Sequence, residues 1–136
     1  GRLASGGPGL VRARMRSAIL HPLGLSVVTT GVIAAIIGFG TLYPMPASPM
    51  LGGNDKLQHF AAFAALAFPI SLARTKTAPY MVAAALLYGG IIEVVQPFVG
   101  RNRSLADLWA DVTGAALGAG AAVLLNWLLG GVLRRT

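Results

Sequence analysis

The sequence predicts an all-α, polytopic membrane protein whose four transmembrane helices form a small bundle. Hydrophobic residues make up 55% of the 136 residues and charged residues only 11%, a composition too apolar for a soluble domain of this length. The mean hydropathy of +0.70 agrees with this assignment. A helix needs about 20 apolar residues to cross the hydrocarbon core, so we expect one domain with three or four spans. The absence of cysteine excludes disulfide bonds, cysteine-ligated zinc and thiol chemistry.

The first segment, residues 1–21, is rich in glycine and basic, so we expect a cytoplasmic arm ahead of the first span. The apolar run over residues 23–43 predicts that span. A signal peptide also begins with a basic segment, but this run is longer than the apolar region of a signal peptide and lacks a small-residue cleavage site.

Prolines and short polar reversals divide the remaining chain. Residues 44–54 contain three prolines, which predict an extended loop, and Asn54 or Asp55 then provides a helix N-cap. The three further spans are expected over residues 56–73, 78–98 and 105–129, separated by the reversals "RTKT" and "VGRNRS". The four-helix domain thus covers residues 22–131, and residues 132–136 form a short basic tail.

The distribution of Lys and Arg predicts the orientation. With the N-terminus in the cytoplasm, eight basic residues lie inside and three outside, as the positive-inside rule requires. The inner set is Arg2, Arg12, Arg14, Arg16, Arg74, Lys76, Arg134 and Arg135, and the outer set is Lys56, Arg101 and Arg103. Both termini are therefore expected in the cytoplasm, and the net charge of +7 needs no nucleic-acid partner to explain it.

This topology gathers the scattered polar residues into one layer at the outer helix ends. The layer contains all four acidic residues, together with His59, Gln96 and the three outer cations. The acidic residues are Asp55, Glu93, Asp107 and Asp111. Since ionisable groups in spans usually face a bundle interior in pairs, we expect Arg101 to pair with Glu93 or Asp107.

Helical spacing predicts that three spans turn these groups to the same interior. Asp107, Asp111, Gly114 and Gly118 follow one another at intervals of four, three and four residues, which places them in one stripe of the fourth span. Gly89, Glu93 and Gln96 repeat this pattern on the third span, and Asp55 and His59 on the second. The Gly114/Gly118 pair has the G-x-x-x-G spacing that allows helix backbones to approach closely.

Two stretches carry a resemblance to a known family. "NDKLQHFAAFAALAF" and "EVVQPFVGRNRSLADLWADVTGAALG" resemble the motifs of the VanZ-like membrane family, and the resemblance extends over residues 23–130. The matching polar positions are Asp55, Lys56, His59, Glu93, Gln96, Arg101 and Asp107, whereas Asp111 stands where the family usually has Asn. The resemblance implies a four-helix integral protein of the bacterial inner membrane, and founding members are linked to resistance against the glycopeptide teicoplanin.

Alternative interpretations of the polar layer stay open. It is either an interhelical lock or an outward-facing site for the head group of a membrane lipid or lipid-linked envelope precursor. As a third possibility, the chain is a noncatalytic accessory subunit that packs against a larger membrane complex. We expect neither a metal nor another cofactor, because His59 and the carboxylates form no metal-binding motif. We also expect no catalytic residue, because no nucleophile elbow surrounds Ser104.

Overall fold

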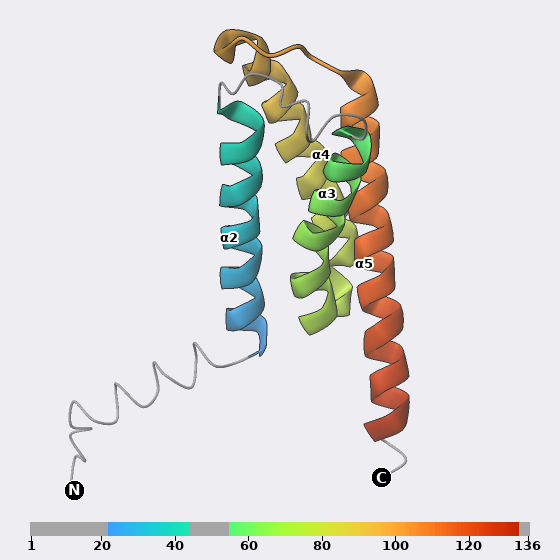
Figure 1. Ribbon diagram of the computed structural model, residues 1–136. Helices are drawn as coiled ribbons and strands as arrows, with labels where there is room; N and C mark the ends of the chain where they lie inside the picture. Colours follow the sequence, from blue (N-terminus) through green and yellow to red (C-terminus); the bar gives the residue numbers. More distant parts are fainter. Residues whose placement is uncertain (1–21, 44–54, 134–136) are drawn as a thin grey trace, which may run out of the picture.

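The computed structural model describes residues 22–43 and 55–133, and helices account for nearly all of this part of the chain (Figure 1). Four helices are long and apolar enough to cross a membrane, and the described residues contain no strand. They are α2 (Pro22–Leu42), α3 (Asp55–Ala73), α4 (Ala78–Val95) and α5 (Leu105–Leu133). The predicted fold class is therefore confirmed.

Several expectations lie outside the described residues. These are the basic arm, the proline-containing loop, the Asn54 cap and the two terminal arginines, and the side chain of Asp55 belongs with them. Within the described part, α2 begins and α5 ends at the same end of the bundle (Figure 1). The opposite end therefore holds the end of α2, the start of α3 and the connection from α4 to α5. We call it the polar end.

The connection from α4 to α5 differs from the expected continuous helix to residue 98. The α-helix ends at Val95 and the chain continues as a short 3₁₀ helix, η3 (Gln96–Val99). Pro97 explains this change, because it has no backbone N–H to donate to the carbonyl four residues earlier. Gly100 then reverses the chain with φ of 78°, a conformation that glycine adopts without steric cost. The Arg101 N–H donates to the Gln96 carbonyl over 2.9 Å, which fixes the start of the connection.

The interface of α3 with α5 is the most closely packed part of the bundle. Gly114 and Gly118 lie directly against the α3 backbone, and an added Cβ would be 2.9 Å from the Phe60 Cα and 2.7 Å from the Ala64 Cα, respectively. Further small residues of α5 are also buried in the bundle: Ala115, Ala119 and Ala122. Because lipid offers no hydrophobic drive between helices, this close approach supplies the attraction through van der Waals contacts.

Helix α2 packs far less closely against the other three helices. Only Ile37 is buried along its whole length, and most of its large apolar side chains are exposed to the surroundings. These exposed residues are Leu25, Val27, Val28, Val32, Ile36 and Phe39. Midway along the helix, the Tyr88 hydroxyl of α4 donates to the Ala34 carbonyl and lies over Gly38. Hydrogen bonds to its backbone therefore add to the apolar contacts around Ile37 in the attachment of α2.

Candidate functional site

Among the described residues, five buried polar or charged side chains lie at the polar end, contributed by α3, α4, η3 and α5. They are His59, Glu93, Gln96, Asp107 and Asp111, and each is less than a tenth exposed. The helical spacing accounts for their burial, because the intervals of three and four residues turn them inward together with Gly89, Gly114 and Gly118. The three helices thus meet in one polar layer at this end.

An interhelical contact between His59 and Asp111 forms the most enclosed part of this layer. The His59 Nδ1 lies 2.8 Å from the Asp111 Oδ1 and joins α3 to α5 one turn before Gly114. Gly89 of α4 lies against the same carboxylate, since an added Cβ at Gly89 would be 2.8 Å from the Asp111 Oδ2. This arrangement fixes the relative positions of α3, α4 and α5 at the polar end.

Glu93 holds the connection between α4 and α5. Its Oε2 accepts a 2.6 Å hydrogen bond from the backbone N–H of Ser104, and its buried Oε1 has no partner in the described structure. The Ser104 hydroxyl in turn accepts from the Asp107 N–H over 3.3 Å and caps α5. The spacing Ser104-x-x-Asp107 is a capping-box pattern, a signal in the sequence that assigns Ser104 a structural role.

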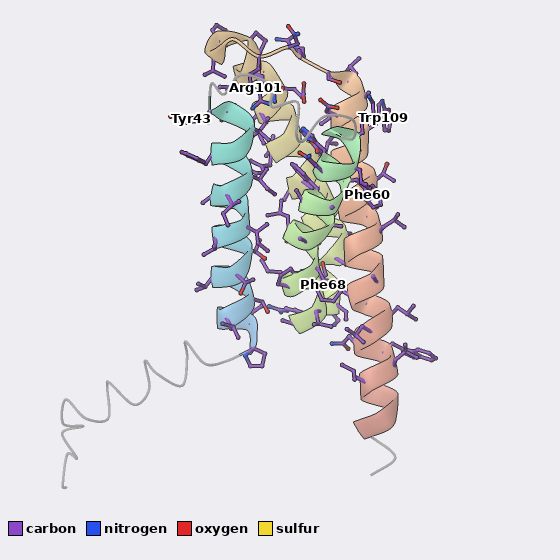
Figure 2. The ribbon with its side chains drawn as sticks, in the orientation of Figure 1. Tyr43, Phe60, Phe68, Arg101 and Trp109 are labelled. Carbon is purple, nitrogen blue, oxygen red and sulfur yellow. The ribbon has the colours of Figure 1, made fainter. Side chains whose placement is uncertain are left out.

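Arg101 does not form the ion pair expected from the sequence. No Arg101 nitrogen lies within 4.0 Å of a carboxylate in the described ranges, so the expected pairing with Glu93 or Asp107 is wrong. Instead the Arg101 Nη1 donates to the Gly40 carbonyl over 3.0 Å at the end of α2. Figure 2 shows Arg101 near this end of α2 and Trp109 on the outer side of α5.

The end of α2 explains why Arg101 takes this position. The last carbonyls of a helix have no partner inside the helix. If the helix continued, the Gly40 carbonyl would accept from the N–H of residue 44, but residue 44 is a proline and has no N–H. The neighbouring Thr41 carbonyl accepts from the Gln96 Nε2 at 3.5 Å. A cation at a helix C-terminus is also favoured by the helix dipole. Gln96 and Arg101 therefore cap α2 from the α4–α5 connection.

These residues surround a pocket of about 650 Å³. It lies among α2, α3, η3 and the connection to α5, and five of the residues expected in the polar layer line it. They are Lys56, His59, Gln96, Arg101 and Asp107. Glu93 and Asp111 are not in the lining. The structure adds polar lining residues that the sequence interpretation did not include in the layer, namely Thr41, Gln58, Asn102 and Ser104.

The pocket changes from polar to apolar along its length. Lys56 lines the part of the pocket nearest the polar end of the bundle. Apolar side chains line the deeper part, namely Ala62 and Phe63 of α3 and Ile36 and Ile37 of α2. Phe63 lies seven positions after Lys56, which corresponds to about 10 Å along the helix. The site therefore offers charged groups at the end of the bundle and an apolar wall at the depth of the spans.

The family assignment follows from a comparison with family models. Residues 13–126 match the VanZ/LLP1 family, and the match includes the four helices as far as Asn126, together with every described residue of the polar layer. No curated protein and no solved structure matches the chain. Because the family model spans far more than half of the sequence, the chain belongs to the VanZ/LLP1 family of membrane proteins.

Proposed function

We propose that the pocket binds the phosphate-bearing head group of a membrane lipid or of a lipid-linked cell-envelope precursor. The observation that carries this proposal is the pairing of two cations, Lys56 and Arg101, with an apolar wall about 10 Å deeper in the bundle. Phosphate oxygens accept charge-assisted hydrogen bonds from both kinds of cation. The apolar wall suits the beginning of an acyl or isoprenoid chain.

The proposed site faces the outer leaflet of the bacterial inner membrane. This orientation has its support in the Lys and Arg distribution, which favours cytoplasmic termini. The polar end then faces the cell exterior, where envelope precursors are displayed. A role in glycopeptide resistance, which the family resemblance suggests, would follow from holding or withdrawing such a precursor.

Lys56 provides the sharpest test of head-group binding. Its side chain is exposed and forms no hydrogen bond or ion pair with another described residue, so replacing it leaves the internal contacts of the bundle intact. We expect Lys56→Gln to weaken binding of phosphatidylglycerol to the purified protein about tenfold, the value of one charge-assisted hydrogen bond. Native mass spectrometry during lipid titration measures this change.

Lys76→Gln is the matched control, because it removes the same charge from the exposed side chain of η2 (Thr75–Thr77) at the other end of the bundle. Equal lipid affinity in both variants and in the parent would contradict the proposal. The assumed orientation is checked in the same preparations before extraction. A single cysteine at Asn102, introduced into a chain that has none, should react with an impermeant maleimide from outside the cell.

The accessory-subunit role remains the alternative outcome. It has support in the exposed apolar faces of α2 and in Gly31, which has open space around it. Size analysis after gentle detergent extraction distinguishes the two proposals. A stoichiometric protein partner that persists in the Lys56→Gln variant would favour the subunit role, and a monodisperse monomer with bound lipid would favour the head-group site.

A further inference from the structure

Gln96 presents a buried hydrogen-bond acceptor at the pocket. Its side chain is only 4% exposed and lines the pocket, and its Nε2 donates to the Thr41 carbonyl, which identifies the other atom of the amide as the oxygen. That oxygen, Oε1, has no hydrogen-bond partner in the described structure. A buried acceptor without a donor is unfavourable, so this atom favours a ligand that brings a hydrogen-bond donor.

Asp107 adds a second acceptor to the same pocket. The residue is 7% exposed, and its carboxylate forms no hydrogen bond or ion pair with any described residue, although its backbone N–H is used by the Ser104 cap. Neither cation of the pocket is paired with it, because Arg101 is bonded to the Gly40 carbonyl and Lys56 forms no ion pair within the described part of the chain. A carboxylate that lines the pocket without a partner from the described residues favours a positively charged donor.

The lining therefore combines groups that suit an anion with groups that suit a cation. Lys56 and Arg101 suit a phosphate, whereas Gln96 and Asp107 suit a group that is both cationic and rich in N–H donors. We infer that the ligand has a zwitterionic head group in which a phosphate diester is joined to a primary ammonium, as in an aminoethyl phospholipid. This inference rests on the proposed function and adds the identity of the head group.

Three lipids with identical acyl chains test the inference on the unmodified, detergent-solubilised protein. Phosphatidylethanolamine carries phosphate and an ammonium with N–H donors. Phosphatidylcholine has the same charges but no N–H donor, and phosphatidylglycerol has hydroxyl donors but no cation. In native mass spectrometry titrations, we expect phosphatidylethanolamine to bind about tenfold more tightly than either of the others, the equivalent of one charge-assisted hydrogen bond.

The variant Asp107→Asn locates the preference in the pocket. It keeps the shape of the side chain and removes its charge, so we expect the tenfold preference for phosphatidylethanolamine over phosphatidylcholine to fall to about twofold or less. Lys76→Gln, a change of one charge at the other end of the bundle, should keep the full preference. If Asp107→Asn does not fold, the three-lipid comparison on the unmodified protein still decides.

The outcomes separate this inference from the proposed function. If all three lipids bind equally and Lys56→Gln weakens them alike, the phosphate site stands and the zwitterionic head group is wrong. If phosphatidylglycerol binds most tightly, the inference is also overturned, since a cation is then not recognised. If Lys56→Gln leaves the binding of every lipid unchanged, the head-group site itself fails.

Discussion

The α3/α5 interface and the contacts of α2 with the other helices are stabilised by different interactions. In the first, two glycines bring backbones together and a buried His59–Asp111 contact fixes the register. In the second, a largely exposed helix combines one row of apolar contacts around Ile37 with hydrogen bonds to its carbonyls from Tyr88, Gln96 and Arg101. The pocket lies between these two regions, with a closely packed wall of α3 on one side and α2 on the other.

This difference indicates which wall of the pocket can move. Displacing α3 from α5 removes close contacts over two turns of helix and breaks a buried polar pair. Displacing α2 breaks a few hydrogen bonds and the smaller apolar contact that Ile33, Ile37 and Leu42 make with the core. Since regions with few buried apolar contacts open at lower free energy, we expect α2 to be the adjustable wall.

The largest effect is expected from Gly114→Leu. An added side chain would clash with the α3 backbone at Phe60, and because backbone cannot rotate aside, we expect a loss of about 3 kcal/mol in the free energy of unfolding. Gly120→Leu is the matched control in the same helix, because no atom lies within 4 Å of its added Cβ. Unfolding in mixed micelles followed by circular dichroism measures both. Equal stability of the two variants would show that the interface is not closely packed.

A smaller effect is expected from His59→Ala, which leaves the buried Asp111 carboxylate without its imidazole. We expect a loss of about 2 kcal/mol, because a hydrogen bond is lost while its acceptor stays buried. A double-mutant cycle with Asp111→Ala should give a coupling energy of about 1 kcal/mol, typical of polar contacts between membrane helices. If the double variant loses only the sum of the two single losses, the His59–Asp111 contact does not stabilise the α3/α5 interface.

The smallest effect is expected from Tyr88→Phe, which removes only the hydrogen bond to the Ala34 carbonyl of α2. A cost of about 1 kcal/mol corresponds to about fivefold more frequent opening of α2. A cysteine in place of the buried Ile37 reports this opening as faster labelling by a membrane-permeant maleimide. Tyr80→Phe is the control, since the Tyr80 side chain is 75% exposed. Unchanged labelling in Tyr88→Phe would mean that α2 is held by other contacts.

Helical periodicity predicted a large part of this arrangement. The intervals of three and four residues identified the inward faces of two helices. The structure buries Gly89, Glu93 and Gln96 along α4 and the start of η3. It also buries the predicted stripe of α5, which consists of Asp107, Asp111, Gly114 and Gly118. Such faces can be predicted from the sequence because the geometry of a single helix fixes the directions of its side chains. The four spans followed from composition for a similar reason, since the hydrocarbon core sets their length.

The partners of these groups depended on contacts between helices and were not predictable in the same way. Charge alone favoured an Arg101 ion pair, but the chain places Arg101 beside a helix end 61 residues earlier. The Glu93 carboxylate was already bonded to the Ser104 backbone, a donor that no count of charged side chains includes. Pro44 and the Ser104-x-x-Asp107 pattern were the available signals, because they mark a carbonyl without a donor and a helix cap.

The capping of α2 has a consequence for the order in which the chain is assembled. The donors that satisfy the Thr41 and Gly40 carbonyls lie 55 and 61 residues later in the sequence. At typical rates of synthesis, roughly 3–12 s separate the emergence of the helix end from that of Arg101. During that interval, water at the membrane surface must hydrate these carbonyls, so α2 reaches its final position only after the connection to α5 has been made.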